Sequence, residues 1–185
     1  MSSRHPGGLR LTARAARIAQ LKAGERVLDV GCGDGETVEF LARYFSVNAC
    51  GADIIASSYP NCIVADAINL PFSNETFDAV FFECVLSILD DPAAAIAEAR
   101  RVLRRGGRLI VSDIYAKSRD SELSLSCLRE LESNGYELLL EEDYTPALVT
   151  FAAESRALPT DTNRCEPKIS AKTHGYVLLL ARKAD

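Results

Sequence analysis

Short apolar runs alternate along the 185-residue chain with stretches in which apolar residues recur at every third or fourth position. The first pattern is typical of buried strands, and the second of helices that pack one face on a sheet. Strands are expected at residues 26–30, 47–53, 61–66, 77–83, 108–114, 136–142 and 175–183. Helices are expected at residues 8–20, 36–45, 93–105, 121–135 and 146–157. This alternation predicts parallel βαβ units, and hence an α/β fold with a doubly wound sheet.

Turn residues mark the ends of several of these elements, and two of the connections have notable lengths or compositions. The Asp-Pro pair at 91–92 has the residue types of a helix start, and the Gly-Gly pair at 106–107 is expected to end the helix 93–105. Only residues 54–60 join the second predicted strand to the third, which is short for a parallel crossover. We expect an irregular loop or a single helical turn there. A polar stretch at 158–172 precedes the last strand.

Length and composition fit one domain over residues 1–185, with an N-terminal helix or lid at 1–22 and the doubly wound core at 23–185. The net charge of −5 disfavours binding to nucleic acid. The first ten residues do not resemble a signal peptide, and the longest apolar run, at 176–181, is too short to cross a membrane. We therefore expect a cytoplasmic protein. The pattern does not distinguish a monomer from a homodimer.

The cysteines do not form the pairs that metal sites use. They stand at positions 32, 50, 62, 84, 127 and 165, never as C-x-x-C. This spacing argues against a structural zinc site, so no metal is expected. Disulfides are also not expected in a cytoplasmic chain. Cys50, Cys62 and Cys127 are interpreted as small buried apolar side chains.

The stretch "VLDVGCGDGETVEFL" at 27–41 places a glycine-rich turn between a predicted strand and a predicted helix. Gly31 allows a tight turn with positive φ, and Gly33 allows a ligand to approach the backbone. The turn lacks the Gly-Lys-Ser/Thr of a P-loop. Glu36 stands where a dinucleotide fingerprint has its third glycine, and Asp34 adds a second acid. An acidic turn is a poor cradle for phosphate, although both acids also suit capping of the next helix.

Three aspartates follow three successive predicted strands: Asp29, Asp53 and Asp66. Carboxyl ends of parallel strands meet at one edge of the sheet, where ligands bind. Asp53 suits a ribose diol, Asp66 could accept from an adenine amine, and Asp29 could orient an ammonium group. Taken singly, each aspartate could instead be an ordinary turn or capping residue. Together they predict a nucleoside ligand with positive charge and no phosphate, of which S-adenosylmethionine (SAM) is one.

The segments "VLDVGCGDGE", "GAD", "VADAINLPFSNETFDAVFFECVLSIL" and "ARRVLRRGGRLIVSDI" resemble successive motifs of the class I SAM-dependent methyltransferases. Within that class they are most similar to the small-molecule group with quinone-biosynthesis and arsenite methyltransferases, and to a short bacterial subgroup. The resemblance covers residues 24–115, and the ending "GYELLLEEDYTPAL…GYVLLLARK" also fits. It implies a Rossmann-like, mostly parallel sheet of seven strands in the order 3-2-1-4-5-7-6, with an antiparallel last strand.

The resemblance also implies a role for each matching position. The cofactor-binding residues would be Asp29, Gly31, Cys32, Gly33, Asp53, Ile54, Asp66, Ala67 and Glu83. Asp53 would contact the ribose, Asp66 and the backbone of Ala67 the adenine, and Glu83 would lie near the transferred methyl group. Cys32 is assigned no chemistry of its own. The implied reaction is transfer of a methyl group to a small-molecule acceptor, which leaves S-adenosylhomocysteine.

Several residues could face the acceptor, each with a plainer alternative. Glu83 could bind a cationic acceptor or take its proton, and His5 could act as a base from a segment folded over the pocket. Cys84 suits packing better than a soft ligand for a metalloid. Tyr115 could line the substrate side or an interface, whereas His174 is expected to be structural.

Two other classes of protein fit part of the pattern. A nicotinamide-dependent oxidoreductase shares the sheet and the ribose acid but needs the missing third glycine. A non-catalytic SAM-binding or interaction protein could keep the same binding residues without turnover. Within methyltransferases, "ECVL" at 83–86 replaces the [N/D]-P-P-[Y/F] motif of enzymes that methylate amino groups of bases or glutamine. A small-molecule acceptor is therefore favoured.

Overall fold

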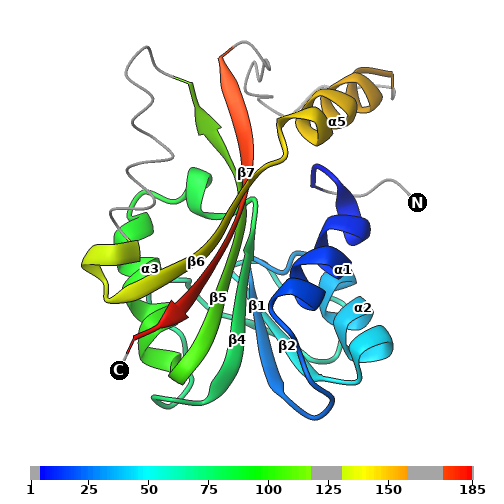
Figure 1. The fold of residues 1–185 in the computed structure, drawn as a ribbon. Coiled ribbons are helices and arrows are strands. Elements are labelled where there is room, and N and C mark those ends of the chain that lie inside the picture. The colour runs from blue at the N-terminus through cyan, green and yellow to red at the C-terminus, as the bar shows by residue number, and fades with distance from the viewer. Residues whose placement is uncertain (1–4, 118–130, 158–172, 185) are drawn as a thin grey trace.

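A computed structural model of the chain describes residues 5–117, 131–157 and 173–184. Its strands form one seven-stranded sheet in the order β3-β2-β1-β4-β5-β7-β6, which confirms the predicted order (Figure 1). The strands are β1 (Arg26–Val30), β2 (Asn48–Asp53), β3 (Cys62–Val64), β4 (Phe77–Glu83), β5 (Leu103–Ala116), β6 (Tyr136–Asp143) and β7 (His174–Lys183). Pairing is parallel from β3 to β5, whereas β7 runs antiparallel to both β5 and β6.

Helices cover both faces of the sheet, as the doubly wound pattern predicts. They are α1 (Gly8–Ile18), α2 (Glu36–Phe45), the short 3₁₀ helix η1 (Leu86–Ile88), α3 (Pro92–Val102) and α5 (Thr145–Ala157). In Figure 1, α1 and α2 lie on one side of the sheet and α3 on the other. Most of the predicted helix 121–135 and the polar stretch 158–172 lie outside the described residues. In the described part of that predicted helix, residues 131–133 are helical.

Two apolar clusters, one on each face, hold the helices against the sheet. On one face Leu11 of α1 and Leu41 of α2 pack with the sheet residue Phe81. On the other, Ile96 of α3 packs with Phe82. Successive β4 residues thus face opposite clusters, because side chains alternate along a strand. Fully burying one such side chain stabilises the fold by about 1.5–3 kcal/mol.

The helix expected at 93–105 ends three residues early, so the prediction that Gly106-Gly107 stops it is wrong. The helix α3 ends at Val102, and β5 begins at once with Leu103, which is buried and pairs with Phe77 of β4. The N–H of Thr76 donates to the carbonyl of Val102 at 2.7 Å, which ties this junction to β4. The register then shifts, and Gly106 (φ +67°) lies in the irregular stretch of the strand. Pairing with a neighbouring strand therefore overrides the local helical pattern.

The connection at 54–60 is an irregular loop without a helix, one of the two forms expected for it. Because the first five strands are parallel, their carboxyl ends share one edge of the sheet, which carries the candidate site. None of the helices in the described part of the chain is long and apolar enough to cross a membrane.

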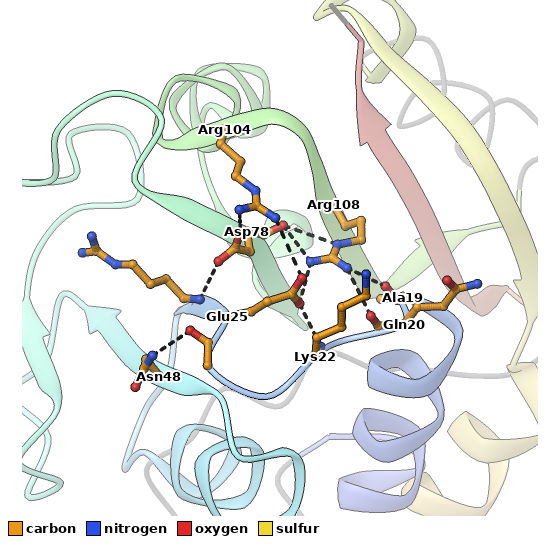
Figure 2. Close-up of polar contacts among 10 residues, drawn as sticks. Ala19, Gln20, Lys22, Glu25, Asn48, Asp78, Arg104 and Arg108 are labelled. Carbon is orange, nitrogen blue, oxygen red and sulfur yellow. Dashed lines mark hydrogen bonds and ion pairs between the residues drawn. The ribbon is translucent and has the colours of Figure 1, made fainter.

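The opposite edge carries a network of charged residues that we call the amino-end network: Glu25, Asp78, Arg104 and Arg108 (Figure 2). Arg108 Nη2 donates to Glu25 Oε2 at 2.7 Å, and Arg104 forms ion pairs with Asp78 and Glu25. Arg108 also donates to the carbonyls of Ala19, Gln20 and Asp78. The network therefore joins the end of α1 to the starts of β4 and β5.

Candidate functional site

The glycine-rich turn after β1 is shaped by the loop that follows β4. Gly31 has φ +78°, and a Cβ atom on it would lie 2.2 Å from Cγ2 of Val85. No other residue type fits this position without displacing Val85. The N–H of Gly31 donates to the carbonyl of Ala52 at 2.7 Å, which ties the turn to β2. The backbone of the turn is thus held rigidly at the carboxyl ends of β1 and β2.

Asp53 ends β2 and faces the same turn. Its Oδ2 accepts from the N–H of Gly33 at 2.8 Å, and its Oδ1 accepts from the N–H of Ile55 at 2.9 Å. Each carboxylate oxygen can accept a further hydrogen bond, and Asp53 is only half-buried. Its free lone pairs therefore suit two neighbouring hydroxyls, as the sequence predicts. Ile54 beside it is 71% exposed, which leaves an apolar surface next to the acid.

Asp29 and Glu83 bring two further acids to the same edge, from the neighbouring strands β1 and β4. Asp29 is buried, and burial raises its pKa well above the usual range; the charges of Glu83 and Asp53 raise it further. Glu83 accepts hydrogen bonds from the hydroxyls of Thr12 and Thr37, both at 2.9 Å. The site therefore gathers acidic groups in a region with little access to water, where burial opposes their ionisation.

The N-terminal segment closes over Glu83. His5 is buried, and its Nε2 lies 3.5 Å from Oε2 of Glu83. Thr12, from the first turns of α1, contacts both oxygens of the same carboxylate. His5 and Glu83 were separate candidates in the sequence, and the fold brings their side chains together.

Asp66 and Ala67 follow β3 at the same edge of the sheet. Asp66 is exposed and accepts from the N–H of Ile68 at 3.1 Å, which forms a local turn. Ala67 is buried. Asp34, in the glycine-rich turn, accepts from the N–H of Glu36 at 3.4 Å, but the N-cap of α2 is Gly35, which has no side-chain capping hydrogen bond.

The cysteines near the site are in packing positions. Burial raises the pKa of Cys84 to about 12, and its Sγ lies 3.4 Å from the hydroxyl oxygen of Tyr176. Burial likewise raises the pKa of Cys32, which disfavours its thiolate form. Cys50 and Cys62 were expected to be buried, but the structure shows them half-buried. Cys127 and Cys165 lie outside the described residues.

Two other candidate residues lie at the carboxyl end of β5 and at the start of β7. The ring of Tyr115 packs across Gly175, where a Cβ atom would lie 2.2 Å from it, so this tyrosine packs against the sheet. His174 begins β7 and lies 2.9 Å from the hydroxyl of Thr173, in keeping with a structural role.

Sequence reasoning missed Thr12, Thr37 and Asp113. The threonines lie within helices and carry no signal that separates them from other helical threonines. Asp113 lies near the carboxyl end of β5 and accepts from the hydroxyl of Ser87 at 2.6 Å. The strand-end rule that selects Asp29 and Asp53 could have found it.

The charges of this edge fit a cationic ligand. In the ranges 5–117, 131–157 and 173–184, no ion pair joins Asp29, Asp53 or Asp113 to a lysine or arginine. The same part of the chain holds no group of three or more His, Cys, Asp or Glu residues arranged for a metal ion. The sulfonium and ammonium groups of SAM would offset the buried acids, whereas a pyrophosphate would be repelled.

Comparisons with known proteins agree with this chemistry. Residues 28–111 match the family described as a methyltransferase domain. Methyltransferase GfsG of Streptomyces halstedii is 28% identical over 160 residues, which are 73% of this chain and 58% of that protein. The 27-O-demethylrifamycin SV methyltransferase of Amycolatopsis mediterranei is 35% identical over 119 residues, which are 56% of this chain and 44% of that protein. The chain thus spans about half the length of these curated relatives.

A solved structure shares nearly the whole fold. The crystal structure of SpnF, a 4+2 cyclase, superposes with a TM-score of 0.79 at 26% identity, over 95% of this chain and 81% of that one. The matched segment 28–111 contains the glycine-rich turn, Asp53 and Glu83. The sheet order, the motifs and these matches agree, and together they support a class I SAM-dependent methyltransferase.

Proposed function

We propose that this chain binds SAM at the carboxyl edge of its sheet and transfers the methyl group to a small-molecule acceptor. The observation that carries the proposal is a pair of acids beside a glycine-rich turn: Asp29, which is buried, and Glu83, whose side chain is 6% exposed. When bound, SAM supplies a methyl group that its sulfonium already activates. The chain's own contribution is then to bind, to orient and to keep water out, and alignment alone supplies about 7–11 kcal/mol in favourable cases.

The proposed contacts follow the position of each residue. Asp29 and the backbone of Gly31 and Gly33 bind the methionine part, with Cys32 between them as packing. Asp53 binds the ribose hydroxyls through its free lone pairs. Three residues at the neighbouring loops bind the adenine: Ile54, Asp66 and Ala67.

We further propose that His5 is the catalytic base for acceptors that must lose a proton, with Glu83 as its positioning residue. Glu83 is held by Thr12 and Thr37, so its carboxylate is fixed in front of the imidazole. It would stabilise the imidazolium that forms when His5 takes a proton, as a carboxylate does in other base–acid pairs. Residues 1–22 would serve as a lid on the core 23–185, which agrees with the contacts of His5 and Thr12.

The acceptor is proposed to be a small molecule, since the chain has no excess of basic residues for nucleic acid and its net charge is −5. The match to a rifamycin methyltransferase, named for a small-molecule acceptor, supports this class. The proposal places the enzyme in the cytoplasm of a bacterium.

Calorimetric titration with SAM, S-adenosylhomocysteine and NAD tests the binding step. We expect micromolar binding of the first two ligands and none of NAD. Binding of NAD alone would overturn the proposal in favour of an oxidoreductase. Transfer of labelled methyl from SAM to a panel of hydroxyl, amine and thiol acceptors tests turnover. SAM binding without transfer to any acceptor would favour a non-catalytic protein, or another use of the fold as in the cyclase SpnF.

The base is tested with His5→Gln. For a hydroxyl acceptor we expect the rate to fall by about 10²–10⁴-fold. The affinity for SAM should change much less than the rate, because the proposed base acts on the acceptor and not on the cofactor. An unchanged rate would overturn the role of His5 and leave SAM binding as it stands.

A further inference from the structure

The turn that follows β4 has an unusual backbone at the point where it meets the site. Cys84 has φ +58°, in the left-handed region that residues other than glycine rarely adopt. The next residue, Val85, fills the space in front of Gly31. Such a conformation persists only where surrounding contacts hold it, and it is often found at functional sites. The question is which contacts hold this turn.

Asp113 of β5 provides these contacts. Its Oδ2 accepts from the N–H of Ser87 at 3.0 Å, and its Oδ1 accepts from the Ser87 hydroxyl at 2.6 Å and from the N–H of Ile114 at 2.7 Å. The carbonyl of Ser112 accepts from the N–H of Cys84 at 2.8 Å. Two neighbouring residues of β5 therefore clamp both ends of the stretch that contains Val85.

The burial of Asp113 argues against an incidental contact. Asp113 is only 5% exposed, and burial raises its pKa while the hydrogen bonds from Ser87 lower it. Within the described ranges no arginine or lysine forms an ion pair with it. A buried carboxylate without a cation is costly, and an apolar side chain would suit a strand equally well. The acid is therefore explained by the turn that it holds.

We propose that Asp113 is a positioning residue for SAM binding: through Ser87 it holds Val85 against Gly31 and so fixes the glycine-rich turn that receives the methionine part of the cofactor. This rests on the proposed function and deepens it. Asp113 contacts the turn after β4 through Ser87. Asp113 acts on the glycine-rich turn through Ser87 and Val85. Loss of the Asp113–Ser87 hydrogen bonds from either side should therefore loosen the backbone after β4.

The test compares Asp113→Asn and Ser87→Ala with a matched control, Asp78→Asn. Asp78 is 6% exposed, comparable to Asp113, but belongs to the amino-end network at the other edge. We measure the Kd for SAM and S-adenosylhomocysteine by calorimetry and the Tm of each ligand-free variant. We expect the Kd for both ligands to rise about tenfold in Asp113→Asn and about two- to tenfold in Ser87→Ala. Asp78→Asn should lower the Tm and leave both Kd values within twofold.

Amide hydrogen exchange of the ligand-free proteins provides a second readout. Exchange at residues 85–89 should be faster in Asp113→Asn and Ser87→Ala than in the unchanged protein, and unaltered in Asp78→Asn. Ser87 is exposed, so its variant folds even if Asp113→Asn does not. Unchanged Kd values in both site variants, with the Tm lowered as in the control, would overturn the proposal. Failure of the unchanged protein to bind SAM would overturn the proposed function as well, which separates the two outcomes.

Discussion

The two edges of the sheet both hold buried acids, but they neutralise them differently. In the amino-end network Asp78 forms an ion pair with Arg104, and Glu25 one with Arg108 (Figure 2). At the carboxyl edge Asp29 is just as buried, yet its charged neighbours are the acids Glu83 and Asp53. The first arrangement contains its own counterions and stabilises the fold. In the second, Asp29 has no ion pair with a lysine or arginine of the described residues, so a positive ligand would favour its ionised form.

This difference explains why the pKa of Asp29 is raised. An ion pair favours the ionised carboxylate, whereas burial beside other acids favours the protonated form. Strained or like-charged groups that the fold does not neutralise are a mark of functional sites. A buried acid is therefore informative only together with the groups around it, and the carboxyl edge is the one that points to a ligand.

The largest effect on stability should come from breaking the amino-end network with Arg108→Met. The change removes the ion pair with Glu25 and leaves three backbone carbonyls without their donor. We expect the free energy of unfolding to fall by about 3 kcal/mol, because Glu25 loses the shorter of its two ion pairs in a partly buried network. Urea denaturation measures this. A matching loss of SAM affinity in the folded protein would contradict the separation of the two edges.

Asp53→Ala should have the largest effect on binding. The change removes a carboxylate that has free lone pairs for two hydroxyls, so SAM affinity should fall by about 1.5–3 kcal/mol, or roughly 10- to 150-fold. Calorimetry at one temperature and pH measures the Kd. Asp53→Asn, which keeps one acceptor oxygen, should lose less. Equal affinities for the alanine variant and the unchanged protein would remove Asp53 from the site.

Asp29→Asn should separate stability from function. Because the folded pKa of Asp29 is raised, the folded state holds its proton longer than the unfolded state does. Stability therefore falls as the pH rises from about 4, the usual carboxyl value, through the raised pKa. The variant cannot ionise, so its Tm without ligand should fall less between pH 5 and pH 8. It should also bind SAM more weakly.

Thermal melts of both proteins across this pH range, without and with SAM, test the point. A variant that melts in parallel with the unchanged protein at every pH would show that Asp29 does not carry the unfavourable charge. Glu98, whose pKa is lowered by its hydrogen bonds with Arg101, provides a control of the opposite sign. Its replacement by Gln should not flatten the loss of stability at high pH.

The smallest effect should come from an exposed ion pair that belongs to neither edge. Glu137 and Arg182 pair across β6 and β7, and both side chains are about half exposed, at 53% and 50%. We expect Glu137→Gln to change the free energy of unfolding by less than about 0.5 kcal/mol, since solvent screens such pairs. A larger loss in urea denaturation would mean that burial does not explain how much the amino-end network contributes to the free energy of unfolding.

Local sequence patterns were sufficient for most of the fold. Apolar periodicity predicted every strand and most helices that the structure describes, but not η1 or the early start of β5 at Leu103. The glycine-rich turn was recognised because few residue types suit its backbone. Asp29 and Asp53 were found for a simple geometric reason, since the carboxyl ends of parallel strands meet at one edge. The antiparallel last strand came from the resemblance to a family, because periodicity does not encode strand direction.

Contacts between distant segments account for what the patterns missed. Glu83 is 71 positions from Thr12 and 46 from Thr37 in the sequence, and Asp113 is 26 from Ser87. The end of α3 at Val102 depends on pairing between Leu103 and Phe77. Periodicity reports only which face of an element is apolar, within a few residues. Which side chains meet across elements depends on how the sheet orders its strands, so these partners emerge only when the chain is folded.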